Sequence, residues 1–168
     1  MFGRGFTIGH LFGFRIRLDL SWFFIVALIT WNLAVDAFPA FYDQFAAPLG
    51  AETEPDTATY WLMGILGAIG LFASVLVHEL SHALVARRYG IEMRGITLFI
   101  FGGVAEMSDE PPSAQAEFAV AIAGPIMSFA IGGVCGIATL FGPGVGLPVE
   151  ATLVIGYLAL LNVLLALF

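Results

Sequence analysis

The feature that most constrains this chain is an apolar run over residues 61–89 that carries two histidines and a glutamate. A membrane-crossing helix needs about 20 predominantly apolar residues, so this run is long enough to span a bilayer. Burying an ionisable side chain in the hydrocarbon core costs free energy. Such residues in a membrane helix therefore usually have a function. On a helix, His78 and His82 project from the same face, one turn apart. The run predicts a membrane helix with a functional site in its second half.

The sequence His78-Glu79-Leu80-Ser81-His82 has the spacing of a metal site. Two imidazoles at positions i and i+4 can bind one Zn²⁺ through their ring nitrogens. Glu79 is close enough to such a metal to accept a proton from water. We interpret His78 and His82 as zinc ligands and Glu79 as the catalytic base. The alternative is a chance match, or histidines that form ordinary interhelical hydrogen bonds.

The composition identifies an integral membrane protein. Of its 168 residues, 60% are hydrophobic and 11% are charged, whereas soluble domains carry about 25% charged residues. There is no lysine and no basic cluster, so nucleic-acid binding is excluded. The single cysteine, Cys135, lies in an apolar stretch and predicts no disulfide framework.

Four apolar segments are candidates for transmembrane helices. They cover residues 20–38, 61–89, 118–141 and 151–168. Residues 36–60 contain three prolines and several acidic residues, and we expect them to form a loop outside the membrane. Gly64, Gly67 and Gly70 form a small-residue ridge that allows close helix approach. We expect this ridge to serve contacts within the chain, and the oligomeric state stays open.

Two further segments have the pattern of β-structure. Residues 3–19 alternate apolar and charged side chains, which predicts a hairpin. Residues 91–107 include a β-prone run over residues 96–101, which Gly102 and Gly103 interrupt. This strand is either an edge on which an extended substrate pairs or a purely structural hairpin.

The basic residues predict the orientation of the chain in the membrane. All six precede the first apolar segment or follow the second: Arg4, Arg15, Arg17, Arg87, Arg88 and Arg94. By the positive-inside rule, the N-terminus and residues 91–117 are cytoplasmic. His78 and His82 then lie in the cytoplasmic half of their helix, where water could reach a metal through a modest cavity.

Several motifs together resemble the site-2 protease family of intramembrane zinc metalloproteases. Residues 3–22 are similar to the family's N-terminal strands and first span, and residues 78–82 match its zinc motif. Phe101-Gly102-Gly103-Val104-Ala105 is similar to its later β segment, and Ala123-Gly124-Pro125 to its third-span signature. Family members often have Asn three residues after that proline, where this chain has Ser128.

The resemblance also implies a third zinc ligand that this chain does not show. In the family it is an Asp in a Leu-Asp-Gly motif, and residues 162–168 look like the run just before it. Catalytic zinc takes three protein ligands, yet Glu150 is the only acidic residue near the fourth segment and lies at its far end. We expect residues 1–168 to form a single but incomplete protease domain that is inactive and binds zinc weakly. Tight zinc binding would point to Glu106 or Asp109 as a substitute ligand.

The expected fold class is a membrane α-helical protein with about four transmembrane helices, the partial core of a polytopic metalloprotease, and short β segments at the cytoplasmic interface. The resemblance implies cleavage of membrane-anchored regulators, such as anti-sigma factors, within or near a prokaryotic plasma membrane. Gly102 and Gly103 are candidate substrate-binding residues, and the expected partners are the lipid bilayer and a transmembrane-helix substrate.

Two other functions stay open at this point. A non-catalytic metal-binding scaffold would account for the missing third zinc ligand. A transporter is disfavoured, because the last two apolar segments have few polar residues to form a transport path. Another membrane peptidase with a glutamate as third ligand explains residues 78–82, but not the segments at 101–105 and 123–125.

Overall fold

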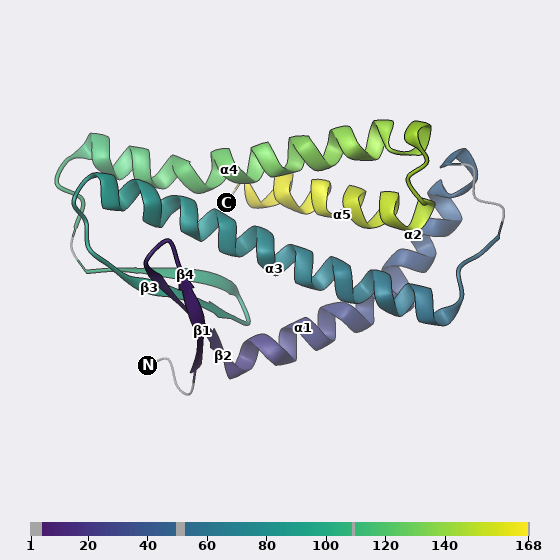
Figure 1. Ribbon diagram of the computed structural model, residues 1–168, viewed down its shortest axis with the longest axis horizontal. Coiled ribbons are helices and arrows are strands. Elements are labelled where there is room, and N and C mark those ends of the chain that lie inside the picture. Colours follow the sequence, from purple (N-terminus) through teal and green to yellow (C-terminus); the bar gives the residue numbers. More distant parts are fainter. Residues whose placement is uncertain (1–4, 50–52, 109, 168) are drawn as a thin grey trace.

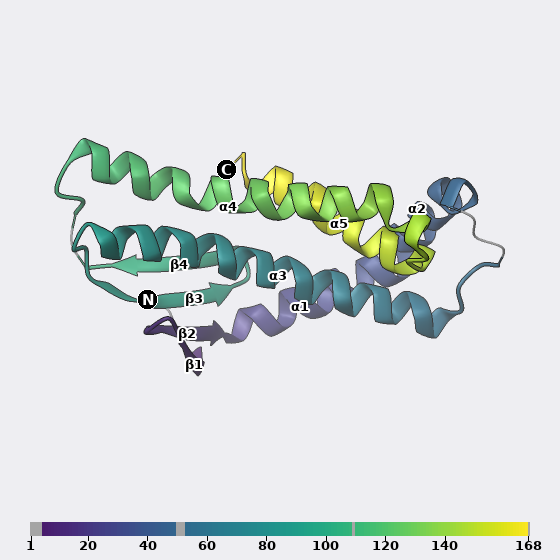
Figure 2. The ribbon, with the colours of Figure 1, turned by 45° about the horizontal axis from the view of Figure 1, so that its top comes forward.

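The computed structural model describes residues 5–49, 53–108 and 110–167. Two long helices, α3 (Thr57–Arg88) and α4 (Ala114–Phe141), run side by side through the molecule. The shorter α5 (Val149–Leu165) packs against both of them, and α1 (Leu20–Asn32) packs against α3. A four-stranded sheet lies along the C-terminal half of α3 (Figures 1 and 2).

The first helical segment is longer than the sequence pattern predicts. After α1, the chain passes through a π-helical turn, η1 (Leu33–Ala37), directly into α2 (Phe38–Phe45). The expected end of this segment at residue 38 is therefore wrong, as is the start of the loop at residue 36. Pro39 lacks an N–H group and its ring crowds the carbonyl group four residues earlier, and the wide turn before it relieves that clash. The fully buried Phe38 then packs with Leu33, Tyr42 and Tyr60.

Helix α3 begins and ends at residues suited to those positions. The side chain of Asp56 accepts a hydrogen bond from the Thr59 N–H and caps the N-terminus. Arg87 and Arg88 lie in the last turn, where they complement the helix dipole, and Gly90 follows with φ of +76°.

The glycine ridge on α3 makes its contacts within the chain. A Cβ atom at Gly64 would lie 2.6 Å from the Thr30 carbonyl oxygen of α1, and one at Gly70 would lie 2.8 Å from the Leu158 side chain of α5. The backbone of α1 therefore approaches α3 at Gly64, where only glycine fits, and the Leu158 side chain of α5 packs against Gly70.

Three helical segments among the described residues are long and apolar enough to cross a membrane: Leu20–Phe45, Thr57–Arg88 and Ala114–Phe141. They correspond to the first three predicted segments. The fourth forms α5, an apolar helix of 17 residues.

The predicted hairpin at residues 3–19 is present, the β segment at residues 91–107 forms a second hairpin, and the two join into one sheet. Strands β1 (Gly5–Leu11) and β2 (Phe14–Asp19) form the first, and β3 (Met93–Phe99) and β4 (Gly102–Met107) form the second. Strands β2 and β3 pair in parallel, which gives the order β1-β2-β3-β4. Ile16 and Ile96, neighbours in this pairing, are buried against Leu80 and Ala83 of α3.

Of the two alternatives for the β-prone run, this topology excludes an edge strand and leaves a structural hairpin. The β-prone run at residues 96–101 contributes to β3, which is an interior strand because it pairs with both β2 and β4. The chain turns at Ile100 and Phe101, so Gly102 and Gly103 begin β4. Among the described residues, the edges of the sheet are β1 and β4.

Candidate metal centre

The two histidines of the apolar run face each other on α3. Their Nε2 atoms lie 3.1 Å apart and their ring centroids 4.8 Å apart. His78 is buried with 7% of its surface exposed, and both rings point toward α4. The spacing on the helix therefore produces the predicted pair of ring nitrogens.

The other nitrogen of each ring is held by α4. His82 Nδ1 lies 2.6 Å from the Val120 carbonyl oxygen, and His78 Nδ1 lies 2.8 Å from Ser128 Oγ. Because a carbonyl oxygen only accepts hydrogen bonds, His82 carries its proton on Nδ1, and its unprotonated Nε2 faces His78 Nε2 at 3.1 Å. Such partners of the second nitrogen orient metal-binding histidines in proteins generally.

Gly124 of α4 leaves the space in front of these two nitrogens open. A Cβ atom at this position would lie 2.2 Å from His82 Nε2 and 2.5 Å from His78 Nε2. Any other residue would therefore displace the imidazoles or fill the space between them and α4. This contact explains why a glycine precedes Pro125 here.

The histidine pair fits a zinc ion. Two nitrogens at about 2.05 Å from a tetrahedral zinc lie about 3.3 Å apart, close to the 3.1 Å between the two Nε2 atoms. Within the described ranges, no group of three or more His, Cys, Asp or Glu side chains could hold a metal. Glu106 of β4 therefore does not complete the site in this structure, and Asp109 lies outside the described residues.

Glu79 lies on a different face of α3, beside β4. Its carboxylate lies near the backbone N–H of Ala105, which is oriented to stabilise a negative charge there. A Cβ atom at Gly103 would lie 2.7 Å from Glu79 Cγ, so glycine allows the strand to approach. Gly103 thus contacts Glu79, while a Cβ atom at Gly102 would meet only Val75.

A cavity of about 380 Å³ opens beside these groups. Glu79 and His82 of α3 line it together with residues of β4 and α4, including Ala105 and Glu117. A cavity of this size lies where the sequence predicts one, beside Glu79 and His82.

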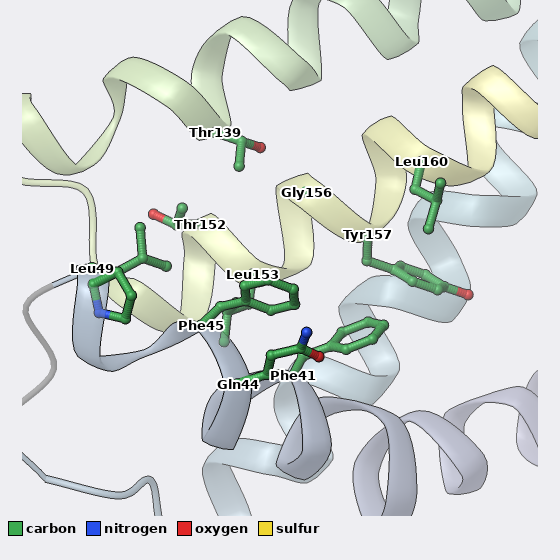
Figure 3. A pocket seen from close by; sticks show the side chains of 11 residues that line it. Phe41, Gln44, Phe45, Leu49, Thr139, Thr152, Leu153, Gly156, Tyr157 and Leu160 are labelled. Carbon is green, nitrogen blue, oxygen red and sulfur yellow. The ribbon is translucent and has the colours of Figure 1, made fainter.

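A second cavity, of about 470 Å³, lies at the opposite end of the helices (Figure 3). Side chains of α2, α4 and α5 surround it, and its polar groups are limited to Gln44, Thr139, Thr152 and Tyr157. It contains no metal-binding side chain and no carboxylate, so it does not contribute to the site.

Sequence reasoning missed the role of Ser128 and the Val120 carbonyl group. Ser128 drew notice only as a departure from the family pattern, yet it is fully buried against His78. Its position one turn after Gly124 on α4 is the signal that could have identified it.

Comparison with known proteins identifies the family of this chain. A family model, Peptidase family M50, matches residues 66–168. A candidate zinc metalloprotease from Synechocystis is 40% identical over 161 residues, covering 96% of this chain and 38% of the relative. Another, from Mycobacterium tuberculosis, is 37% identical with the same coverage. This chain thus spans about two fifths of the length of these curated relatives.

A solved structure has a similar fold. The site-2 protease from Methanocaldococcus jannaschii matches with a TM-score of 0.63 and 28% identity, covering 97% of this chain and 62% of that chain. The resemblance predicted from the motifs is therefore confirmed. The chain belongs to peptidase family M50, the family of the site-2 proteases.

Proposed function

We propose that this protein is an intramembrane zinc endopeptidase that cleaves membrane-anchored proteins. The observation that carries the proposal is the pair of Nε2 atoms 3.1 Å apart, held by α4 and adjacent to Glu79. The relatives named as zinc metalloproteases support the same chemistry. A bound zinc would supply Lewis-acid chemistry, polarising a peptide carbonyl group and making water more acidic.

Each of the three predicted residues then has a defined task. His78 and His82 would hold the zinc through Nε2, since hydrogen bonds to α4 occupy both Nδ1 atoms. Glu79 would accept a proton from water and pass it to the departing amine. These residues provide two metal ligands, whereas catalytic zinc usually takes three from the protein. The family resemblance assigns the third to an Asp in a Leu-Asp-Gly motif.

We place the substrate at the outer edge of β4. A helical substrate must unwind before cleavage, because its carbonyl groups are hydrogen-bonded within the helix. An unwound segment could add to β4 as a further strand. Support for this position comes from Gly103 and Ala105, which bring β4 directly against Glu79. Gly102, at the start of the same edge, would leave room for the substrate backbone.

The distribution of charge supports a membrane orientation for this site. The described arginines lie on the sheet, or at the end of α3 that it covers: Arg15, Arg17, Arg87, Arg88 and Arg94. We propose that this end faces the cytoplasm, that α5 is the fourth span, and that the membrane is the plasma membrane of a prokaryote.

The test is Glu79→Gln in a full-length version of the protein that also carries the Leu-Asp-Gly motif, reconstituted into liposomes with a membrane-anchored model substrate. We expect this variant to retain zinc and to lose cleavage, because the amide cannot accept the proton. Glu92→Gln, an exposed position between α3 and β3, is the matched control and should cleave normally. Cleavage by the Glu79→Gln variant would show that the assigned base is wrong. Zinc binding without cleavage by the unmodified protein would favour a non-catalytic scaffold.

A further inference from the structure

A groove of about 610 Å³ lies between α3 and α4, on the side of this helix pair away from Glu79. Ser81 and Leu84 of α3 line it, and Ser81 projects about 200° around the helix from Glu79. The groove and the cavity beside Glu79 are therefore separate spaces that flank the same histidine pair.

The α4 wall of the groove is an exposed apolar stripe. Phe118, Ile122 and Ile126 follow each other at intervals of four residues, with 67%, 38% and 60% of their surfaces exposed. Helix α4 is one of the helices long and apolar enough to cross a membrane. Such a stripe on a membrane helix suits hydrocarbon rather than water.

The end of the groove differs chemically from its walls. Arg88 and Tyr89, at the C-terminal end of α3, line it there. The neighbouring Arg87 is engaged by the fold: it donates a hydrogen bond to the Phe12 carbonyl oxygen at 2.7 Å and lies 4.9 Å from the centre of the Phe14 ring.

Arg88, by contrast, is exposed and makes no ion pair or side-chain hydrogen bond with any residue in the described ranges. No carboxylate lines the groove either. Arginine and tyrosine are typical anchors at membrane interfaces, where their polar groups meet lipid headgroups. The groove therefore combines an apolar channel with one uncompensated positive charge at its mouth.

We propose that this groove binds one anionic phospholipid. Its phosphate group would pair with Arg88 beside the Tyr89 hydroxyl group, and an acyl chain would lie against Ile122 and Ile126. The proposal does not depend on proteolysis. Its consequence for the metal site follows from the groove floor, where Ser81 and Ala123 directly precede His82 and Gly124 in the chain. A bound acyl chain would exclude water from the contact between α3 and α4 that holds the two imidazoles.

The experiment compares lipid retention in nanodiscs of phosphatidylcholine with and without phosphatidylglycerol, followed by native mass spectrometry. The unmodified protein should retain one phosphatidylglycerol molecule. Arg88→Gln should lower that retention about fivefold, the effect of one arginine at an anionic surface. Arg15→Gln removes the same charge from an exposed position on β2 outside the groove, and should have no effect.

A second variant tests the apolar part of the site. Ala119→Phe would fill the groove from α4 and should reduce retention while Arg88 stays in place. Equal retention by Arg88→Gln and the unmodified protein would overturn the proposal. Equal losses in Arg88→Gln and Arg15→Gln would also overturn it, because they would indicate general attraction to an anionic surface.

Discussion

Ser128 shows how a single buried hydroxyl group can control the histidine pair. It is fully buried on α4, and its Oγ lies 2.8 Å from His78 Nδ1. We expect Ser128→Ala to weaken zinc affinity by about 10- to 100-fold, the usual effect of removing an outer partner of a ligand. Competition with a chromophoric chelator measures this affinity. Ser81→Ala is the control, since the Ser81 hydroxyl group bonds only to the Val77 carbonyl oxygen of its own helix; equal affinities would argue against the role of Ser128.

Gly124 provides a second test at the level of one residue. A methyl group there would lie within 2.5 Å of both Nε2 atoms, so Gly124→Ala should abolish metal binding. Gly133→Ala lies on the same helix with open space around it and should leave metal binding intact. Alanine is also the better helix former, by about 1 kcal/mol. Metal content after purification distinguishes the two variants, and normal zinc in Gly124→Ala would contradict the proposed position of the metal.

At the level of elements, the start of α1 is joined to the sheet by a short chain of hydrogen bonds. The Asp19 carboxylate accepts from the Ser21 hydroxyl group at 2.7 Å and from the Ser21 N–H at 3.0 Å. The Ser21 hydroxyl oxygen in turn accepts from the Ile100 N–H, at the turn after β3. The Ser21 hydroxyl and N–H groups hold the pKa of Asp19 below its ordinary value of 3.8.

A lowered pKa means that the folded state binds fewer protons than the unfolded state, so Asp19 stabilises the fold above pH 3.8. This stabilisation should disappear as the pH falls through the lower pKa of the folded state. Asp19→Asn keeps a capping side chain but cannot titrate. Melting temperatures in detergent between pH 3 and pH 7 should therefore depend less on pH in this variant. An unchanged pH dependence would mean that other carboxylates dominate acid unfolding.

Helix α5 is joined to α3 by a buried polar contact one turn before His78. Asn162 is fully buried, and its Nδ2 donates to Ser74 Oγ and to the Leu158 carbonyl oxygen, both at 2.9 Å. We expect Asn162→Ala and Ser74→Ala each to lower the unfolding free energy, with a coupling of about 0.6–1.7 kcal/mol, as for hydrogen bonds between membrane helices. A double-mutant cycle of unfolding in micelles measures this coupling. Strictly additive losses would show that the contact contributes nothing.

At the level of the whole molecule, α3 contacts several neighbouring elements at once, because the side chains of successive residues point about 100° apart around a helix. His78 and His82 face α4, Glu79 faces β4, and Leu80 and Ala83 pack on the sheet. The parallel pairing of β2 with β3 makes this possible, because it joins the two hairpins into one surface. The metal ligands and the proposed base are thus held on neighbouring faces of one helix, the ligands by α4 and the base by β4.

Much of this arrangement can be predicted from local sequence patterns. Apolar length predicts the long helices, and the i, i+4 spacing predicts the facing histidines. Alternation predicts the first hairpin, and a β-prone run predicts β structure at residues 91–107. The end of the first helical segment is less predictable. Prolines and acidic residues indicate a loop, but burial of Phe38 and Tyr42 extends the helix through Pro39 by way of a π-helical turn. Tertiary packing there outweighs local preference.

The sequence by itself determined the membrane helices, the histidine pair and the family, because each depends on residues close together in the chain or on ordered motifs. Only the tertiary structure decided which strand is the free edge, and which groups hold the imidazoles. Both depend on contacts across dozens of residues: β2 pairs with β3, and His78 meets Ser128, 50 positions away. Local periodicity identifies the face that a residue occupies, but it does not identify the element packed against that face.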